Sequence, residues 1–463
     1  MHRTGRSRRA AGVMRNRLAQ NPGAVFEGVL SKHEVDEQCR LLGHMWRDRI
    51  FTPLVTLWTF LWQVLDADPA CRQAVARTLG FLSATVGLDA SHDPSAYCKA
   101  RKRLPEQLLP GLTRLVAHKL AAKVQPTGLW HGRRVKLLDG SSVAMWDSAS
   151  NQAAYPQPKG QEPGCGFPVA RIVAVFDLIT GAVVDLAMGA LRVSERVLSH
   201  QLWDWIEAGE VLVADRYYGS YADIALLRLR GVDTVLRLHQ SRKTDFRRGK
   251  RLGPHDRLVQ WHKGVRAKWM TPAEFQALAD TQQLRLLRFA CQVAGWRPEQ
   301  IVVVTTLLDP QAYPAPEIAQ LYRLRWEVET DLAHLKTTMK MEFLRTRSPQ
   351  MVRRELWAHL LAYNLVRTLM WEAARRRRCA PMRLSFKGAI QQIHALWPFT
   401  VAIARQRDLS RFYEALLKAV GSQRIPKRPN RSEPRVRKRR PKNYRLMTKP
   451  RQQYNHSRPA NGA

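Results

Sequence analysis

The chain has 463 residues, enough for two to four domains. With 45% hydrophobic and 25% charged residues it can bury a sizeable core, which excludes a globally disordered chain. The 76 Lys and Arg residues outweigh 38 Asp and Glu residues, and the net charge of +38 favours nucleic acid as a partner over a membrane surface. The six cysteines lack the short paired spacings of zinc ribbons and disulfide scaffolds, which is typical of a reducing cytoplasm.

The N-terminal quarter of the sequence is basic and then helical. Residues 1–24 have no apolar core, which excludes a secretory signal and leaves a DNA-contacting arm or an organellar transit peptide. From 25 to 125 the periodicity is helical, and we expect a helical DNA-binding domain there. Its apolar run at 50–65 is interrupted by Pro53 and Gln63, so it predicts a buried helix rather than a membrane span.

A further helix is predicted directly after Asp93, which is placed to cap it, with Pro94 at its first position. Pro105 ends the helix. It carries four basic side chains, Lys99, Arg101, Lys102 and Arg103. These residues either contact DNA or form a solvated face, and the pattern leaves both readings open.

From residue 130 the pattern changes to strands. We expect a short strand ending at Asp139, a hairpin over 169–191 and a buried strand ending at Asp215. Further strands are predicted at 232–240 and 301–309, with a partly β insertion at about 240–300, and helices at 321–336 and 353–378. The 41 residues from Gln423 hold 14 Lys and Arg, one acid and six prolines, which predicts a disordered basic tail.

The predicted helix at 321–336 carries three carboxylates, of which Glu329 is best placed for chemistry. At about 100° per residue, Glu329 shares a strip roughly 60° wide with Tyr322, Arg325 and Lys336. The apolar stripe beside this strip consists of Leu321, Leu324, Val328, Leu332 and Leu335. Glu327 and Asp331 fall outside the strip, and we expect them to be ordinary solvated charges. A simple ion pair between Arg325 and Glu329 is the structural alternative.

Two aspartates complete the candidate site. Asp139 and Asp215 each follow a short apolar strand, and the carboxyl ends of strands commonly face the ligand crevice of α/β sheets. A turn-forming role is the alternative for both, and Asp177 and Asp185 rank lower because they lie within the hairpin. Two aspartates and a glutamate would form an all-oxygen site that suits Mg²⁺ or Mn²⁺. Two such ions about 4 Å apart can promote phosphodiester chemistry.

These residues resemble a known family. The spacing Tyr322-x2-Arg325-x3-Glu329-x6-Lys336 resembles the YREK signature of DDE transposases of the insertion-sequence-four type. The segments LLDGSSV (137–143) and VLVADRYYGSYADI (211–224) resemble the surroundings of that family's first and second catalytic aspartates. The predicted order β-β-β-α-β-α-β resembles the ribonuclease-H-like fold. The resemblance extends over about 30–420.

The resemblance implies an α/β fold with a ribonuclease-H-like mixed sheet flanked by helices. The catalytic domain would span 130–420, with the β-rich insertion at about 240–300. An all-helical DNA-binding domain (25–125) and a basic arm (1–24) would precede it, and the disordered basic tail (423–463) would follow. Two departures stand out. Ile301 occupies a position where some relatives carry a base-stacking tryptophan, with Trp296 the nearest one here, and no acid follows Asp215-Arg216.

The activity implied is that of a cut-and-paste transposase acting on the terminal inverted repeats of its own element. Water would cut at the element's end, and the freed 3′-OH would attack the opposite strand to form a hairpin. The hairpin would then be reopened, and the ends would join target DNA. Asp139, Asp215 and Glu329 would be catalytic and hold two Mg²⁺ or Mn²⁺ ions. Tyr322, Arg325 and Lys336 would contact the DNA.

The resemblance also implies partners and a location. The partners would be double-stranded DNA, as element ends and target, and a second subunit in a homodimeric synaptic complex. The location would be the bacterial cytoplasm, at the nucleoid. Two alternatives remain from the residues alone: a catalytically silent DNA-binding protein derived from a transposase, and a ribonuclease-H-like nuclease without strand transfer.

Overall fold

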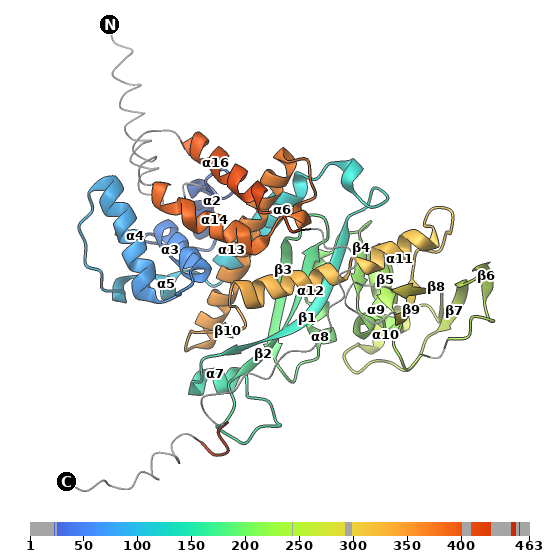
Figure 1. The fold of residues 1–463 in the computed structure, drawn as a ribbon. Helices are drawn as coiled ribbons and strands as arrows, with labels where there is room; N and C mark the ends of the chain where they lie inside the picture. Colours follow the sequence, from blue (N-terminus) through green and yellow to red (C-terminus); the bar gives the residue numbers. More distant parts are fainter. Residues whose placement is uncertain are drawn as a thin grey trace.

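The computed structural model describes residues 23, 26–242, 244–291, 299–400, 409–426, 446–450 and 453. It contains one mixed β-sheet with helices packed around it (Figure 1). Almost all of the predicted basic arm, Trp296 and most of the predicted tail lie outside the described residues. Within the described ranges, no helix has the length and apolar character needed to cross a membrane.

The sheet has the strand order β3-β2-β1-β4-β5-β9-β8-β7-β6, and β10 pairs with β1. The first three strands are antiparallel neighbours, and β4 and β5 then run parallel to β1, so the predicted mixed sheet is confirmed. The strand bounds are β1 Val135–Met145, β2 Val169–Asp177, β3 Val183–Ala190, β4 Val211–Ala214, β5 Asp233–Arg237, β6 Lys250–Gly253, β7 Asp256–His262, β8 Thr281–Cys291, β9 Glu299–Thr305 and β10 Phe343–Leu344.

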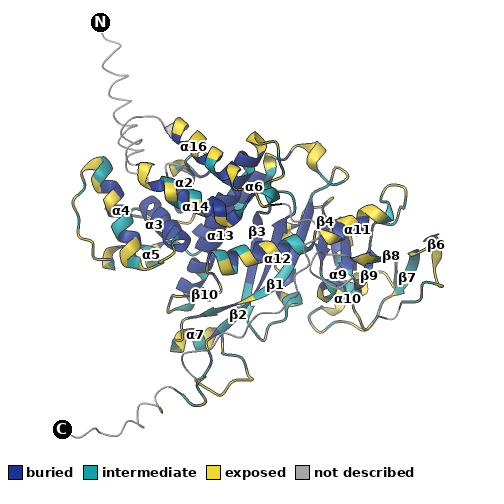
Figure 2. Cartoon of the chain, viewed as in Figure 1, coloured by how far each residue is buried: buried dark blue, intermediate teal, exposed yellow. Residues whose placement is uncertain are grey.

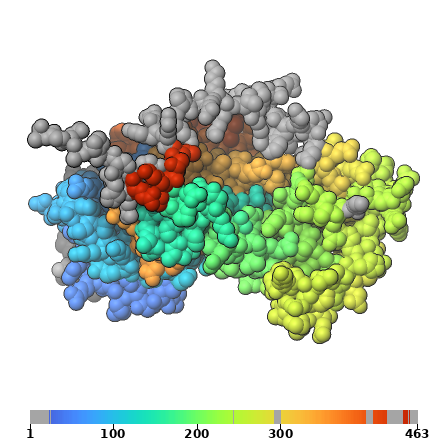
Figure 3. Space-filling view, turned by 90° about the horizontal axis from the view of Figure 1, so that it is seen from below, coloured from blue at the N-terminus to red at the C-terminus, as the bar shows by residue number. Residues whose placement is uncertain are grey.

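The segment at about 240–300 is β-rich, and its strands continue the same sheet. β9 pairs antiparallel with β5, and β8, β7 and β6 follow outward from it. Buried Arg285 of β8 forms an ion pair with Asp256 of β7 at 2.6 Å, which ties two of these strands together. The space-filling view shows this segment in yellow-green at one end of an elongated molecule and the N-terminal helices in blue at the other (Figure 3).

The helices of 25–125 share a hydrophobic core with the sheet. α3 is buried along its whole length, which confirms the buried helix predicted at 50–65. The long central helix α13 packs against α3, α6 and α16, and Figure 2 shows it as mostly buried. The helix bounds are α2 Lys32–Leu41, α3 Pro53–Leu65, α4 Cys71–Val86, α5 Ser95–Arg103, α6 Leu108–Ala122, α7 Ala149–Ala154, α8 Glu195–His200, α9 Tyr221–Leu229, α10 Pro272–Ala277, α11 Ala315–Arg323, α12 Trp326–Ala333, α13 Pro349–Arg376, α14 Phe386–Leu396 and α16 Leu409–Ser422.

Three predicted boundaries were wrong. The helix expected at 321–336 is divided into α11, α12 and a π-helical turn over His334–Thr338. The break between α11 and α12 turns Leu324 out of the apolar stripe, and its side chain is 39% exposed. Gln423 and Arg424 are paired, although the disordered segment was predicted to start at Gln423: the Gln423 carbonyl accepts a hydrogen bond from the Ser385 amide, and Arg424 forms an isolated β-bridge with Leu384.

The third wrong boundary is that of the first strand. Asp139 does not end β1, because antiparallel pairing with β2 continues as far as Ala144 opposite Val169. The prediction failed because the apolar pattern of the sequence stops at Asp139, whereas the backbone pairing of β1 with β2 continues beyond it.

Candidate active site

The parallel pairing of β1 with β4 brings Asp139 and Asp215 to the same level of the sheet. The last paired residues are Leu138 and Ala214, so each aspartate is the next residue of its strand. β4 ends there and a short 3-10 turn, Arg216–Tyr218, begins, whereas β1 continues beside β2. The sheet therefore opens next to Asp139, and both side chains lie at this opening. The two aspartates therefore lie on neighbouring, parallel strands.

Arg325 joins the first aspartate to the glutamate. The side chain of Arg325 is 8% exposed, and its Nη2 donates to Glu329 Oε1 at 3.0 Å. Its Nη1 lies 3.7 Å from Asp139 Oδ2 on β1. The helical ion pair of the structural alternative is therefore present, but it extends across to the sheet. An exposed helical pair would have no reason to reach a buried strand, so this arrangement favours a functional site.

Lys336 fixes the other end of the strip to β1. Its Nζ donates to Ser141 Oγ at 2.9 Å, two residues after Asp139. The π-helical turn that contains Lys336 widens the helix at this point. Together, Arg325 and Lys336 place two positive charges along the strand that carries Asp139.

Tyr322 is buried rather than presented to solvent. Its residue is 1% exposed, and its ring centroid lies 6.0 Å from the Arg325 guanidinium carbon. Burial raises the pKa of the phenol well above its usual range. In this structure Tyr322 packs beside Arg325 from the core side. The helical projection of the sequence could not tell whether Tyr322 would be buried or exposed.

The electrostatics of the site are those of crowded carboxylates. Burial, together with the charges of Asp215 and Glu329, raises the pKa of Asp139 to about 6, against the opposing effects of the Gly140 amide and Arg325. A divalent cation would relieve this crowding, and three carboxylates are the donors that Mg²⁺ prefers. Among the described residues no three His, Cys, Asp or Glu side chains already stand in a metal-ligating arrangement. In this structure the charge of Arg325 neutralises Asp139 and Glu329. The three carboxylates are suitable ligands for a cation, but their side chains would have to change rotamer to bind one.

The expectation that Asp331 is a solvated charge was wrong. Asp331 is 1% exposed and forms an ion pair with Arg367 of α13, whose side chain is also 1% exposed. Glu327 is half-buried, and burial raises its pKa. The helical projection failed because α13 packs over this side of α12, which no local pattern predicts. Asp331 is a structural residue and not a rival for Glu329.

The two aspartates of the hairpin are structural as well. Asp177 accepts hydrogen bonds from the amide and hydroxyl of Thr180 and so shapes the turn, where Gly181 adopts φ +67°. Asp185 pairs with Arg114 of α6 at 2.9 Å. These contacts agree with the low rank that the sequence assigned to Asp177 and Asp185 as candidate site residues.

One acidic residue beside Asp139 was missed. The Glu195 carboxyl lies over Gly140: a Cβ added to this glycine would stand 2.5 Å from Glu195 Cδ. Tyr218 Oη donates to Glu195 Oε2 at 3.3 Å, and Arg171 Nε lies 3.8 Å from Glu195 Oε1. In the sequence Glu195 reads as an ordinary first-turn residue after the helix cap Ser194, so no local signal distinguished it.

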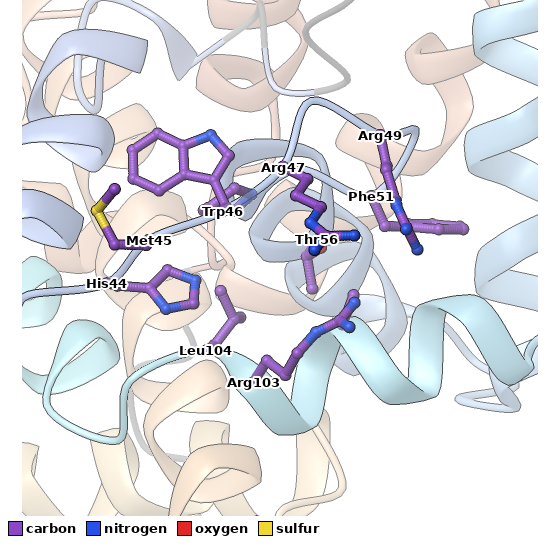
Figure 4. A pocket seen from close by; sticks show the side chains of 11 residues that line it. His44, Met45, Trp46, Arg47, Arg49, Phe51, Thr56, Arg103 and Leu104 are labelled. Atoms are coloured by element: carbon purple, nitrogen blue, oxygen red, sulfur yellow. The ribbon is translucent and has the colours of Figure 1, made fainter.

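The helical segment 25–125 also carries a basic surface. A cavity of about 240 Å³ opens between the loop at 43–52, the start of α3 and the end of α5 (Figure 4). Arg103 of α5 lines it, but Arg101 of the same helix points inward and donates to Gln63 Oε1 at 2.9 Å. The capping role predicted for Asp93 was wrong: Pro94 is the N-cap and α5 begins at Ser95, although the Asp93 carboxylate accepts a hydrogen bond from the Ser95 amide. The basic face of α5 is thus only partly available to a ligand.

Comparisons with known proteins identify the family of this chain. Residues 130–365, about half of the chain, match the family model of the transposase DDE domain. The transposase InsG for insertion sequence element IS4 of Escherichia coli K12 is 26% identical over 354 residues, which cover 76% of this chain and 78% of that protein. The putative transposase InsL for insertion sequence element IS186A of the same strain is 24% identical over 280 residues, covering 54% and 70%.

Among solved structures, a piggyBac transposase synaptic complex with hairpin DNA aligns over 89% of this chain and 87% of that chain, with 10% identity and a TM-score of 0.45. The resemblance in the YREK signature and the match of the family model agree on the class. This chain belongs to the DDE transposases, of the insertion-sequence-four type.

Proposed function

We propose that this transposase works by cut-and-paste on the terminal inverted repeats of its own element, with Asp139, Asp215 and Glu329 as its catalytic carboxylates. The observation that carries the assignment is the position of Arg325, which lies between Asp139 on the sheet and Glu329 on α12 while Asp215 stands at the next strand. Three acids from two strands and a helix converge on one opening, where a phosphodiester can approach from solvent.

The reaction needs an attacking oxygen and a stabilised leaving oxygen at one phosphorus atom. Two Mg²⁺ or Mn²⁺ ions held by the three carboxylates would lower the pKa of the attacking oxygen and offset charge on the leaving one. Arg325 and Lys336 would hold phosphates of the strand being cut, because their charges line β1 beside Asp139. Tyr322, packed against Arg325, would position that arginine.

The same carboxylates would serve each later step. After the first cut releases a 3′-OH, that hydroxyl attacks the opposite strand, so one P–O bond forms as another breaks and a hairpin closes. Water then reopens the hairpin, and the 3′-OH attacks target DNA in the same way. We further propose that residues 25–125 bind the repeat and that two subunits hold the two ends. The net charge of +38 supports binding of long DNA by this chain.

The test is strand cleavage and joining by the full chain on a duplex that carries the element's end, with Mg²⁺. The proposal expects a nick at the end, a hairpin and a joined product. A catalytically silent binding protein would shift the duplex in a gel but leave it whole. A nuclease would cut it and never join it. Either result would contradict the proposal.

A further inference from the structure

We infer that the cavity between the loop at 43–52, α3 and α5 is a binding site for one unpaired nucleotide of DNA. The inference rests on the proposed function, since it gives the helical segment a DNA ligand. Three arginines line the cavity: Arg47, Arg49 and Arg103. Rings and apolar side chains form the rest of the wall, with Trp46, His44 and Phe51 among them. A cationic rim around an aromatic wall is the combination that binds a phosphate and its base.

The aromatic part of the wall is held in place. The rings of His44 and Trp46 stack, with centroids 6.0 Å apart and an angle of 24° between planes. Burial and the charge of Arg103 lower the pKa of His44, so this ring stays neutral and contributes as a flat surface. The neighbouring Met45 is 90% exposed and stands at the mouth. In Figure 4 Trp46, His44 and Met45 lie on one side, with Arg47, Arg49 and Arg103 toward the other.

The floor of the cavity holds an unused hydrogen-bonding group. Thr56 of α3 is 1% exposed and lines the cavity, and its Oγ1 has no hydrogen-bond partner in the described part of the chain. A buried hydroxyl without a partner costs free energy, so such groups are rare unless a ligand or water uses them. A base entering past the arginines would meet this hydroxyl with one polar edge.

A duplex phosphate alone does not account for these features. Phosphates of an intact helix are reached by exposed arginines on a convex surface and need neither a recess nor an aromatic wall. A base taken out of the stack needs both, because it exchanges its stacked neighbours for protein rings. The cavity therefore fits a nucleotide that is unpaired at a DNA end, a nick or a distorted step.

The test uses the full chain and two fluorescent duplexes, one fully paired and one with a single unpaired 2-aminopurine nucleotide. We expect the wild type to bind the second more tightly, by about tenfold, and Trp46→Ala to remove that preference while keeping its affinity for the paired duplex. Thr56→Val should lower the preference without lowering the melting temperature, because it removes only an unpartnered hydroxyl. Arg103→Gln should weaken binding and flatten its salt dependence by about one unit of slope. Arg72→Gln, an exposed arginine of α4 outside the cavity, is the control.

Equal affinity of the wild type for both duplexes would overturn the inference, and so would a preference that survives Trp46→Ala. Failure of the proposed function is a separate result, because it is read from cutting and joining rather than from binding. If the chain cuts DNA but shows no preference for the unpaired nucleotide, only the nucleotide site is refuted. If it shows the preference but never cuts, the nucleotide site stands and the cut-and-paste proposal is refuted.

Discussion

Asp331→Asn should strongly destabilise the fold while leaving the chemistry intact. Asp331 and Arg367 are each 1% exposed, so the substitution leaves a buried guanidinium without its counter-charge. Breaking a buried pair in this way typically costs about 3–5 kcal/mol. Arg367 also donates to Tyr363 Oη at 2.8 Å, and this remaining contact places the expected loss near the lower end, about 3 kcal/mol.

The assay is urea unfolding followed by fluorescence, beside cleavage measured well below the melting temperature. With a slope of about 3 kcal/mol per molar, the urea midpoint should fall by roughly 1 M. Glu327→Gln is the control, because Glu327 is only half-buried and its loss should cost less than about 1 kcal/mol. A variant Asp331→Asn as stable as the wild type, or a stable but inactive one, would refute the structural role assigned to Asp331.

Three further predictions concern the DNA-handling charges. Arg325→Lys should cut far more slowly than the wild type in single-turnover assays, because an ammonium cannot reach Asp139 and Glu329 at once; near-normal cutting would return this residue to a simple helical pair. Ser141→Ala should slow cutting less than Lys336→Gln does, because it removes only the acceptor that orients the lysine; the opposite ranking of the two rates would contradict a phosphate role for Lys336. Truncation after Pro426 removes 13 Lys and Arg against one Glu, a net charge of +12, so the salt dependence of nonspecific DNA binding should flatten while cutting at saturating protein persists; an unchanged slope would mean that this segment does not contact DNA.

The sequence predicted the parts of the site that local rules determine. Strand periodicity located β1 and β4, and parallel pairing of neighbouring strands then brings Asp139 and Asp215 together. The spacing of Arg325 and Glu329 on one helical turn likewise required no tertiary information. The signature from Tyr322 to Lys336 was informative because it is a pattern of four residues rather than a single motif.

The remaining features depend on packing between distant segments. Asp331 looked solvated because its partner Arg367 lies 36 residues away on α13. The burial of Tyr322 could not be predicted, because it depends on how α11 packs against β5 and β8. Glu195 could not be recognised, since its approach to β1 depends on Gly140 and on the face that α8 covers. Arg101 and Arg103 looked equivalent on α5, yet only Arg103 lines the cavity.

The most direct test of the catalytic assignment is Mg²⁺-dependent cutting of a terminal-repeat duplex by Glu329→Gln and Glu327→Gln side by side. The two residues lie two positions apart on α12 and carry the same group, but only Glu329 is joined through Arg325 to Asp139. The account predicts that Glu329→Gln binds the duplex and fails to cut it, while Glu327→Gln cuts at close to the wild-type rate. An active Glu329→Gln beside an inactive, fully folded Glu327→Gln would contradict it.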